Sequence, residues 1–162
     1  KFVVFVDHHL ATVKALQKTL ESFEVTDRAE ILCKGALDAI RWLEDNGKEG
    51  EGVLEAVGDS WSPYGRISAS TGLPTVLGWP WHEHQWRGSR KSFEGREEDV
   101  RAIYTTQDSS EAVALLRRYD IRYVVVGPRE RAKYGSQGLS KFSQMGEAVF
   151  PGKDVIIYRV SQ

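Results

Sequence analysis

Aromatic and charged side chains that could contact a ligand gather in one stretch of the chain, at about residues 64–87. The set that we single out is Arg66, Trp79, His82, Glu83, Trp86 and Arg87. Aromatic faces stack on sugar rings or bases, and arginine offers fixed donors to phosphate or carboxylate groups. This combination is typical of a site for a sugar-phosphate or for the end of a glycan. The alternative is that the tryptophans fill the core beneath a long irregular segment.

Two histidine pairs raise the question of a metal site. His82 and His84 would share one face of a strand but would point roughly 200° apart on a helix, and no third ligand is recognisable beside them. Asp7-His8-His9 follows an apolar run, and it resembles the Asp-His-His motif of a family of metal-dependent phosphoesterases, whose upstream acidic motifs are absent. A stable zinc site needs three or four ligands. We therefore predict no metal, and we find no catalytic set.

Composition narrows the function classes. The 162 residues carry 22 Lys+Arg against 23 Asp+Glu, and 41% of them are hydrophobic. Such a balance describes a soluble globular domain and excludes a generally basic nucleic-acid binder, so no nucleic-acid partner is expected. No apolar run approaches the roughly 18 residues of a membrane span. The single Cys33 excludes an internal disulfide and a cysteine-based zinc site.

Hydrophobic patterning predicts strands and helices in alternation. The predicted strands are residues 2–6, 29–32, 53–57, 74–78, 121–126 and 154–160. Helical spacing of apolar residues predicts helices near residues 10–23, 37–43, 66–70, 96–104, 108–119, 129–134 and 139–145. Continuous apolar strands suit a sheet covered on both faces. We therefore expect a single α/β domain: a three-layer sandwich with a mainly parallel sheet and a C-terminal β-hairpin at residues 148–160.

The larger part of the chain carries two specific motifs, Thr-Gly-Leu-Pro-Thr-Val-Leu-Gly-Trp at residues 71–79 and Gln-Trp-Arg-Gly at residues 85–88. With Tyr-Gly-Arg-Ile-Ser at 64–68 and Arg-Tyr-Val-Val-Val-Gly at 122–127, they make residues 39–162 resemble the C-terminal soluble domain of the YYY family of archaeal and Chloroflexi polytopic membrane proteins. That family is similar to glycosyltransferases of the C superfamily, which use lipid-linked sugars.

This resemblance implies that the catalytic acid lies in a membrane part that the chain lacks. We therefore expect a non-catalytic domain on the extracytoplasmic face, which contacts a sugar or sugar-phosphate and meets the membrane only through the missing part. No cofactor is expected.

The first part of the chain supports a different hypothesis. Val3-Val4-Phe5-Val6-Asp7 and residues 27–32 make residues 2–39 similar to a βαβ segment of Rossmann-like methyltransferases that modify ribosomal RNA guanine. By that resemblance Asp7 would bind the ribose of S-adenosylmethionine. The glycine-rich loop that should precede Phe2 is absent, however, and Lys34-Gly35-Ala36 stands where an acid usually follows the next strand. An S-adenosylmethionine- or nucleotide-binding fragment is therefore the alternative function.

The two resemblances meet near residues 34–41, which suggests a composite of residues 1–38 and 39–162. A third interpretation follows, an engineered chimeric scaffold without a ligand. Separately, Arg87, Arg90, Lys91 and Arg96 form a basic run. Such a run either touches phosphates or anionic lipid headgroups or forms a solvated loop balanced by nearby glutamates.

Overall fold

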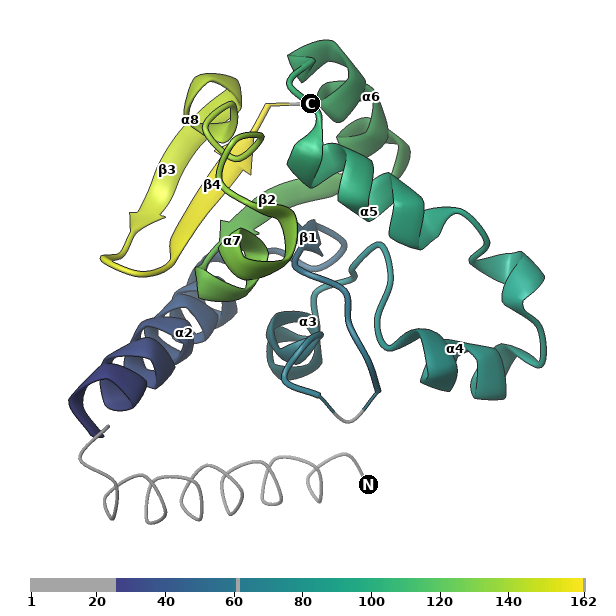
Figure 1. Cartoon of the computed structure of the whole chain (residues 1–162), viewed down its shortest axis with the longest axis horizontal. Helices are drawn as coiled ribbons and strands as arrows, with labels where there is room; N and C mark the ends of the chain where they lie inside the picture. The colour runs from purple at the N-terminus through teal and green to yellow at the C-terminus, as the bar shows by residue number, and fades with distance from the viewer. Residues whose placement is uncertain (1–25, 61, 162) are drawn as a thin grey trace.

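The computed structural model describes residues 26–60 and 62–161, and it contains a four-stranded mixed sheet (Figure 1). The strands are β1 (Gly52–Leu54), β2 (Ile121–Val126), β3 (Gly146–Pro151) and β4 (Ile156–Val160), in the order β1-β2-β4-β3. Strands β1 and β2 pair in parallel, whereas β4 is antiparallel to both β2 and β3. The C-terminal hairpin is confirmed, but the expectation of a mainly parallel sheet is wrong. The sheet is mostly antiparallel because β4 runs opposite to β2, so both pairs that β4 makes are antiparallel.

Helices flank this sheet. In chain order they are α2 (Thr26–Asn46), α3 (Arg66–Thr71), α4 (Pro80–Arg87), the 3₁₀ helix η1 (Arg90–Ser92), α5 (Arg96–Thr105), α6 (Ser109–Arg118), α7 (Pro128–Tyr134) and α8 (Phe142–Met145). The predicted helices near 66–70, 96–104, 108–119 and 129–134 are confirmed. In Figure 1, α2 lies on the side of the β3–β4 hairpin, and α4 and η1 project on the opposite side of the molecule.

Three of the predicted strands need correction. Residues 29–32 lie inside α2, because a short apolar run cannot be told from a helical segment by its pattern alone. Residues 74–78 form no strand: Val53 N–H donates to Pro74 O at 2.8 Å, and Val76 O accepts from the Arg96 guanidinium at 3.0 Å. The Arg96 side chain thus donates to a backbone carbonyl that a neighbouring strand would otherwise pair with. The strand predicted at 53–57 is shorter, Gly52–Leu54, and residues 2–6 lie outside the described ranges.

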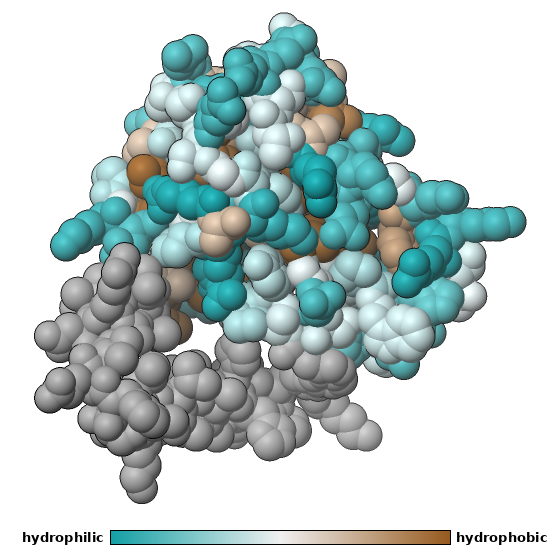
Figure 2. Space-filling view, in the orientation of Figure 1, coloured by the Kyte–Doolittle hydropathy of each residue, from teal (hydrophilic) through white to brown (hydrophobic). Residues whose placement is uncertain are grey.

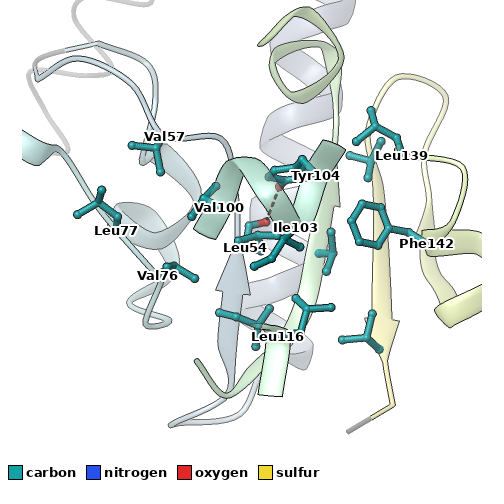
Figure 3. Packing of buried hydrophobic residues seen from close by; sticks show 14 of the residues in the cluster. Leu54, Val57, Val76, Leu77, Val100, Ile103, Tyr104, Leu116, Leu139 and Phe142 are labelled. Carbon is teal, nitrogen blue, oxygen red and sulfur yellow. Dashed lines mark hydrogen bonds between the residues drawn. The ribbon is translucent and has the colours of Figure 1, made fainter. Parts of the chain in front are cut away.

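The sheet separates two hydrophobic clusters because side chains alternate along β2. Tyr123 and Val125 pack with residues of α2 and α3, whereas Val124 and Val126 pack with residues of α5 and α6. Figure 3 shows the second cluster, in which the side chain of Tyr104 points toward Leu54. Helices therefore cover both faces of the sheet, which is why β2 is apolar along nearly its whole length.

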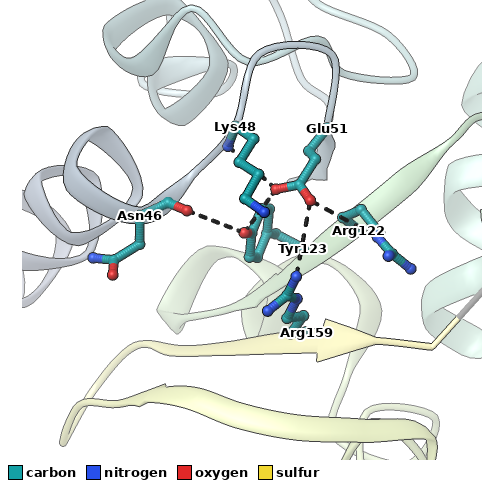
Figure 4. A network of polar contacts seen from close by, with 6 residues as sticks. All are labelled: Asn46, Lys48, Glu51, Arg122, Tyr123 and Arg159. Carbon is teal, nitrogen blue, oxygen red and sulfur yellow. Dashed lines mark hydrogen bonds and ion pairs between the residues drawn. The ribbon is translucent and has the colours of Figure 1, made fainter.

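A polar network centred on Glu51 holds the segment that precedes β1 (Figure 4). Tyr123 Oη donates to Glu51 Oε2 at 2.9 Å, and Lys48 N–H donates to the same oxygen at 3.2 Å. The guanidinium groups of Arg122 and Arg159 each lie 4.0 Å from Glu51 Oε1. Burial alone would raise the pKa of Glu51, but these hydrogen bonds and the charges of Arg159 and Lys48 outweigh it and hold the pKa below its ordinary value.

Replacing Glu51 with glutamine is expected to remove a pH-dependent part of the stability. Because the pKa of Glu51 is lower in the folded chain than in the unfolded chain, its contribution is present above about pH 4.5 and is lost as pH falls through the folded value. We expect a cost of about 1 kcal/mol at pH 7 that shrinks as pH falls below about 4.5. Urea unfolding of wild type and Glu51→Gln across that range measures it, with exposed Glu49→Gln as the control. A pH-independent difference would contradict the assignment.

The surface is predominantly polar. On the face drawn in Figure 2, hydrophilic side chains dominate, and hydrophobic ones appear as small separate areas. Three large hydrophobic side chains of the described residues are nevertheless exposed: Leu37 at 47%, Trp81 at 52% and Trp86 at 86%. Among the described residues, no helix has the length and apolar character needed to cross a membrane.

Candidate ligand cleft at the carboxyl edge of the parallel strands

An open cleft of about 580 Å³ lies where the two parallel strands end. Its lining comes from the loop after β1, from the starts of α4 and η1, and from α5 and α7: Gly58, Asp59, Ser60, Tyr64, Pro80, Trp81, Arg90, Glu97, Ala132 and Lys133. In open α/β sheets, ligands bind in the crevice outside the carboxyl ends of the strands. The volume is in the range of small-molecule sites.

A buried carboxylate fixes the segment that follows β1. Glu55, 2% exposed, accepts hydrogen bonds from the N–H groups of Ile67 at 3.0 Å and Ser68 at 2.8 Å, at the start of α3. Burial raises the pKa of Glu55 even though these hydrogen bonds favour its charged form. The bonds hold α3 against the end of β1, so the loop between them keeps its position at the cleft.

A second buried carboxylate joins the ends of both parallel strands. Glu130, 1% exposed, accepts from Ala56 N–H through Oε1 at 3.1 Å and from Gly127 N–H through Oε2 at 2.8 Å. Ala56 follows β1, and Gly127 follows β2 and precedes α7. Glu130 thus sets the spacing between the two loops that border the cleft.

Two tyrosines form hydrogen bonds to the backbone at the carboxyl ends of β1 and β2. The Tyr104 hydroxyl lies 3.2 Å from Leu54 O and 2.9 Å from Val125 O, and it donates its proton toward these strand carbonyls. Its ring stacks on that of Tyr134, with centroids 4.6 Å apart. Tyr134 Oη in turn accepts from Val57 N–H at 3.3 Å, and burial raises the pKa of Tyr134 to about 12. Both phenols therefore stay protonated and serve as fixed supports.

One wall of the cleft consists of a tyrosine held by cations. Arg129 and Lys133 lie over the Tyr64 ring, 5.5 and 5.6 Å from its centroid. Lys133 also forms an ion pair with Glu97 at 3.6 Å and donates to Val57 O. This ammonium group therefore contacts several partners at once, and these contacts fix its position in the wall.

The other wall is less constrained. Trp81 is half exposed, and Arg90 is exposed and forms no ion pair within the described residues. Two cations, Arg90 and Lys133, face two carboxylates, Asp59 and Glu97, so the lining is balanced in charge. An aromatic ring with paired donors and acceptors suits a polyhydroxylated ligand better than a strongly anionic one.

None of the six residues singled out from the sequence lines this cleft, whereas Arg90 of the basic run does. The structure brings several of the six together beside it. Trp79 Nε1 donates to Tyr64 O at 2.5 Å, and the Trp79 and His82 rings lie 5.0 Å apart. Arg66 begins α3 and donates to Pro63 O at 3.3 Å. Trp79 therefore ties the start of α4 to the Tyr64 turn.

The remaining predicted residues lie farther along α4. Glu83 and Arg87 form an ion pair one helical turn apart, and the Trp86 side chain is exposed to solvent. Because residues 80–87 are helical, His82 and His84 do not share a face, and no group of three or more potential metal ligands occurs among the described residues. Asp7, the residue of the alternative cofactor hypothesis, lies outside the described ranges.

Sequence reasoning missed Glu55, Tyr64, Trp81, Glu130 and Lys133. A signal existed for Glu130, which stands three residues after Gly127 at the start of α7, the spacing of a capping box. Glu55 carried a weaker signal, a charged residue in the middle of the apolar run at residues 53–57. Nothing in the sequence pairs Lys133 with Tyr64, because their contact depends on the tertiary fold.

Comparison with known proteins supports the fold. No family model matches the chain, and no curated protein matches it. Among solved structures, the C-terminal globular domain of an oligosaccharyltransferase from Archaeoglobus fulgidus matches with a TM-score of 0.51 and 16% identity, over 78% of this chain and 97% of that one. The two chains share a fold. The expected resemblance to a domain of a glycosyl-transferring enzyme is thus confirmed at the level of the fold, whereas the YYY family stays a prediction.

Proposed function

We propose that this chain is the C-terminal extramembrane domain of a glycosyltransferase-like membrane protein, and that its cleft contacts a sugar or a sugar-phosphate without transforming it. The observation that carries the proposal is a polar cleft at the carboxyl edge of β1 and β2, in a fold shared with a domain of an oligosaccharyltransferase. In this proposal the domain lies on the extracytoplasmic face, where a glycan would reach the cleft.

The chemistry of the cleft supports a sugar as the ligand. Trp81 offers an exposed aromatic face on which a pyranose ring can stack. Asp59 and Glu97 can accept hydrogen bonds from sugar hydroxyls, and Arg90 can pair with a single phosphate. The Ser60 hydroxyl, buried and without a hydrogen-bond partner among the described residues, is an additional group that such a ligand would satisfy.

The residues predicted from the sequence take two different roles in this proposal. Trp79 and His82 position the cleft by fixing Tyr64 to the start of α4, and Arg66 holds the intervening turn. Glu83, Trp86 and Arg87 belong to the far part of α4, where they would contact a longer glycan that extends beyond the cleft. The shortest ligand should therefore depend on Trp81 and not on Trp86.

Thermal unfolding in the presence of sugar probes tests the proposal. Hexose 1-phosphates and short oligosaccharides are titrated against the wild type, Trp81→Ala and Trp86→Ala. A ligand at a hundred times its dissociation constant should raise the free energy of unfolding by about 2.7 kcal/mol, which corresponds to an increase in Tm of about 5–10 °C. We expect Trp81→Ala to abolish this shift and Trp86→Ala, a matched exposed tryptophan, to retain it for monosaccharides.

Other outcomes would redirect the proposal. A shift abolished by Trp86→Ala alone would move the site to the outer part of α4. A shift with S-adenosylmethionine and with no sugar would favour the cofactor hypothesis. No shift with any probe at saturating concentration would contradict a ligand in the cleft and favour a scaffold.

A further inference from the structure

The segment formed by α4 and η1, residues 80–92, combines a bare tryptophan with cationic side chains. Trp86 is 86% exposed, the largest exposure among the large hydrophobic side chains of the described residues. Arg87, Arg90 and Lys91 follow it within five positions and are all exposed. The amphipathic indole of tryptophan is suited to the boundary between water and lipid. A single exposed apolar side chain is common on protein surfaces, so Trp86 is informative only together with the cations beside it.

The α4–η1 segment carries an excess of positive charge. Its cations Arg87, Arg90 and Lys91 are opposed within the segment only by Glu83, which already pairs with Arg87. Neither Arg90 nor Lys91 has an ion pair within the described residues. The closest acids in sequence after it are Glu94, Glu97 and Glu98, and Glu97 is engaged by Lys133. Positive charge therefore remains available beside the exposed indole.

The position of the segment makes it accessible to a flat surface. In Figure 1, α4 and η1 project from the body of the domain, on the opposite side from the β3–β4 hairpin. No residue of α4 or of η1 is buried in the core. A planar partner can thus approach α4 and η1 from outside the domain.

We propose that the α4–η1 segment docks on an anionic lipid bilayer, with Trp86 at the interface and Arg87, Arg90 and Lys91 against the headgroups. The exposed indole and the excess of positive charge complement such a surface together, whereas neither feature alone would select it. The docking surface shares Arg90 with the cleft and shares Trp86 and Arg87 with the proposed contact to a longer glycan. Lys91 belongs to neither, so Lys91→Glu tests the docking separately from the cleft ligand.

Vesicle co-sedimentation of the full chain tests the docking. We expect binding to mixed phosphatidylcholine and phosphatidylglycerol vesicles at low salt, little binding to phosphatidylcholine alone, and weakening as salt shortens the Debye length. Lys91→Glu should lower the partition coefficient roughly tenfold, since each cation near an anionic surface contributes on the order of a tenfold preference or less. Trp86→Ala should lower it by a similar factor, roughly tenfold, because the apolar contact is lost.

Matched controls separate the segment from general charge and hydrophobicity. Lys153→Glu removes an exposed cation in the turn of the hairpin, and Leu37→Ala removes an exposed apolar side chain of α2. Both should change vesicle binding by less than about twofold. Absence of binding to anionic vesicles would overturn the proposal. Equal loss in the controls and in the segment variants would also overturn it, because the attraction would then belong to the whole surface.

Discussion

Glu130→Gln is expected to lower the free energy of unfolding by about 3 kcal/mol and to reduce Tm by about 6–12 °C. Both carboxylate oxygens of Glu130 accept from backbone N–H groups, those of Ala56 and Gly127, in a nearly fully buried position. A glutamine of the same shape can accept with one atom only and points its NH₂ group at the other N–H. One buried donor is then left without an acceptor, which is costly.

The effect should be specific to the buried site. Glu147→Gln, on the exposed face of β3, removes the same charge and should change stability by no more than about 0.5 kcal/mol. Chemical denaturation at neutral pH compares both variants with the wild type. Because Glu130 joins the loops after β1 and β2, amide hydrogen exchange of Ala56 and Gly127 should also accelerate in Glu130→Gln. Unchanged exchange at these two amides would show that the carboxylate does not hold the cleft edge.

Phe142→Ala is expected to cost about 3–5 kcal/mol, the largest effect of any single substitution proposed for this domain. The Phe142 side chain is fully buried. Its ring packs against the edge of Tyr104 at 5.9 Å and beside Tyr158 at 6.2 Å, and the Lys141 ammonium lies 4.4 Å from its centroid. Truncation leaves a cavity between α8, α5 and β4, and it removes the support on which Tyr104 braces the strands.

A graded series distinguishes a cavity from loss of the fold. Phe142→Leu retains most of the volume and should cost less than half as much as Phe142→Ala. Leu37→Ala, at an exposed position, should cost less than about 0.5 kcal/mol. Urea unfolding monitored by circular dichroism measures the three variants. Equal costs for the leucine and alanine variants would indicate that the ring contacts, and not the filled volume, dominate at this position.

The strongest local patterns of the sequence were sufficient to predict several elements. The run at 121–126 is apolar enough to be a central strand, and the turn at Pro151-Gly152-Lys153 separates two apolar runs, so β2 and the hairpin follow from local physics. The cap at Asp108, whose side chain accepts from Ser110 N–H, similarly marks the start of α6. Each of these elements depends on residues that are close together in the chain.

The wrong predictions concern a short apolar run whose pattern fits a helix as well as a strand, and segments whose state depends on distant partners. Residues 29–32 and 74–78 have strand-like composition, yet the first lies within a 21-residue helix and the second is held by the Arg96 side chain. The direction of β4 was also beyond local reasoning, because either orientation beside β2 would bury the same apolar face. For residues 74–78 and for β4, the outcome depends on which distant neighbour satisfies the backbone.

The candidate site likewise has features that follow from the sequence and features that depend on the tertiary fold. The sequence by itself determined that aromatic and cationic residues gather at 64–87, since their types and spacing are local properties. Only the tertiary structure decided that Tyr64 and Trp81 meet Glu97 and Lys133 across a cleft, while Trp86 remains in solvent. The physical reason is that the parallel strands β1 and β2 bring loops separated by about seventy residues to one edge, where buried Glu130 accepts hydrogen bonds from both.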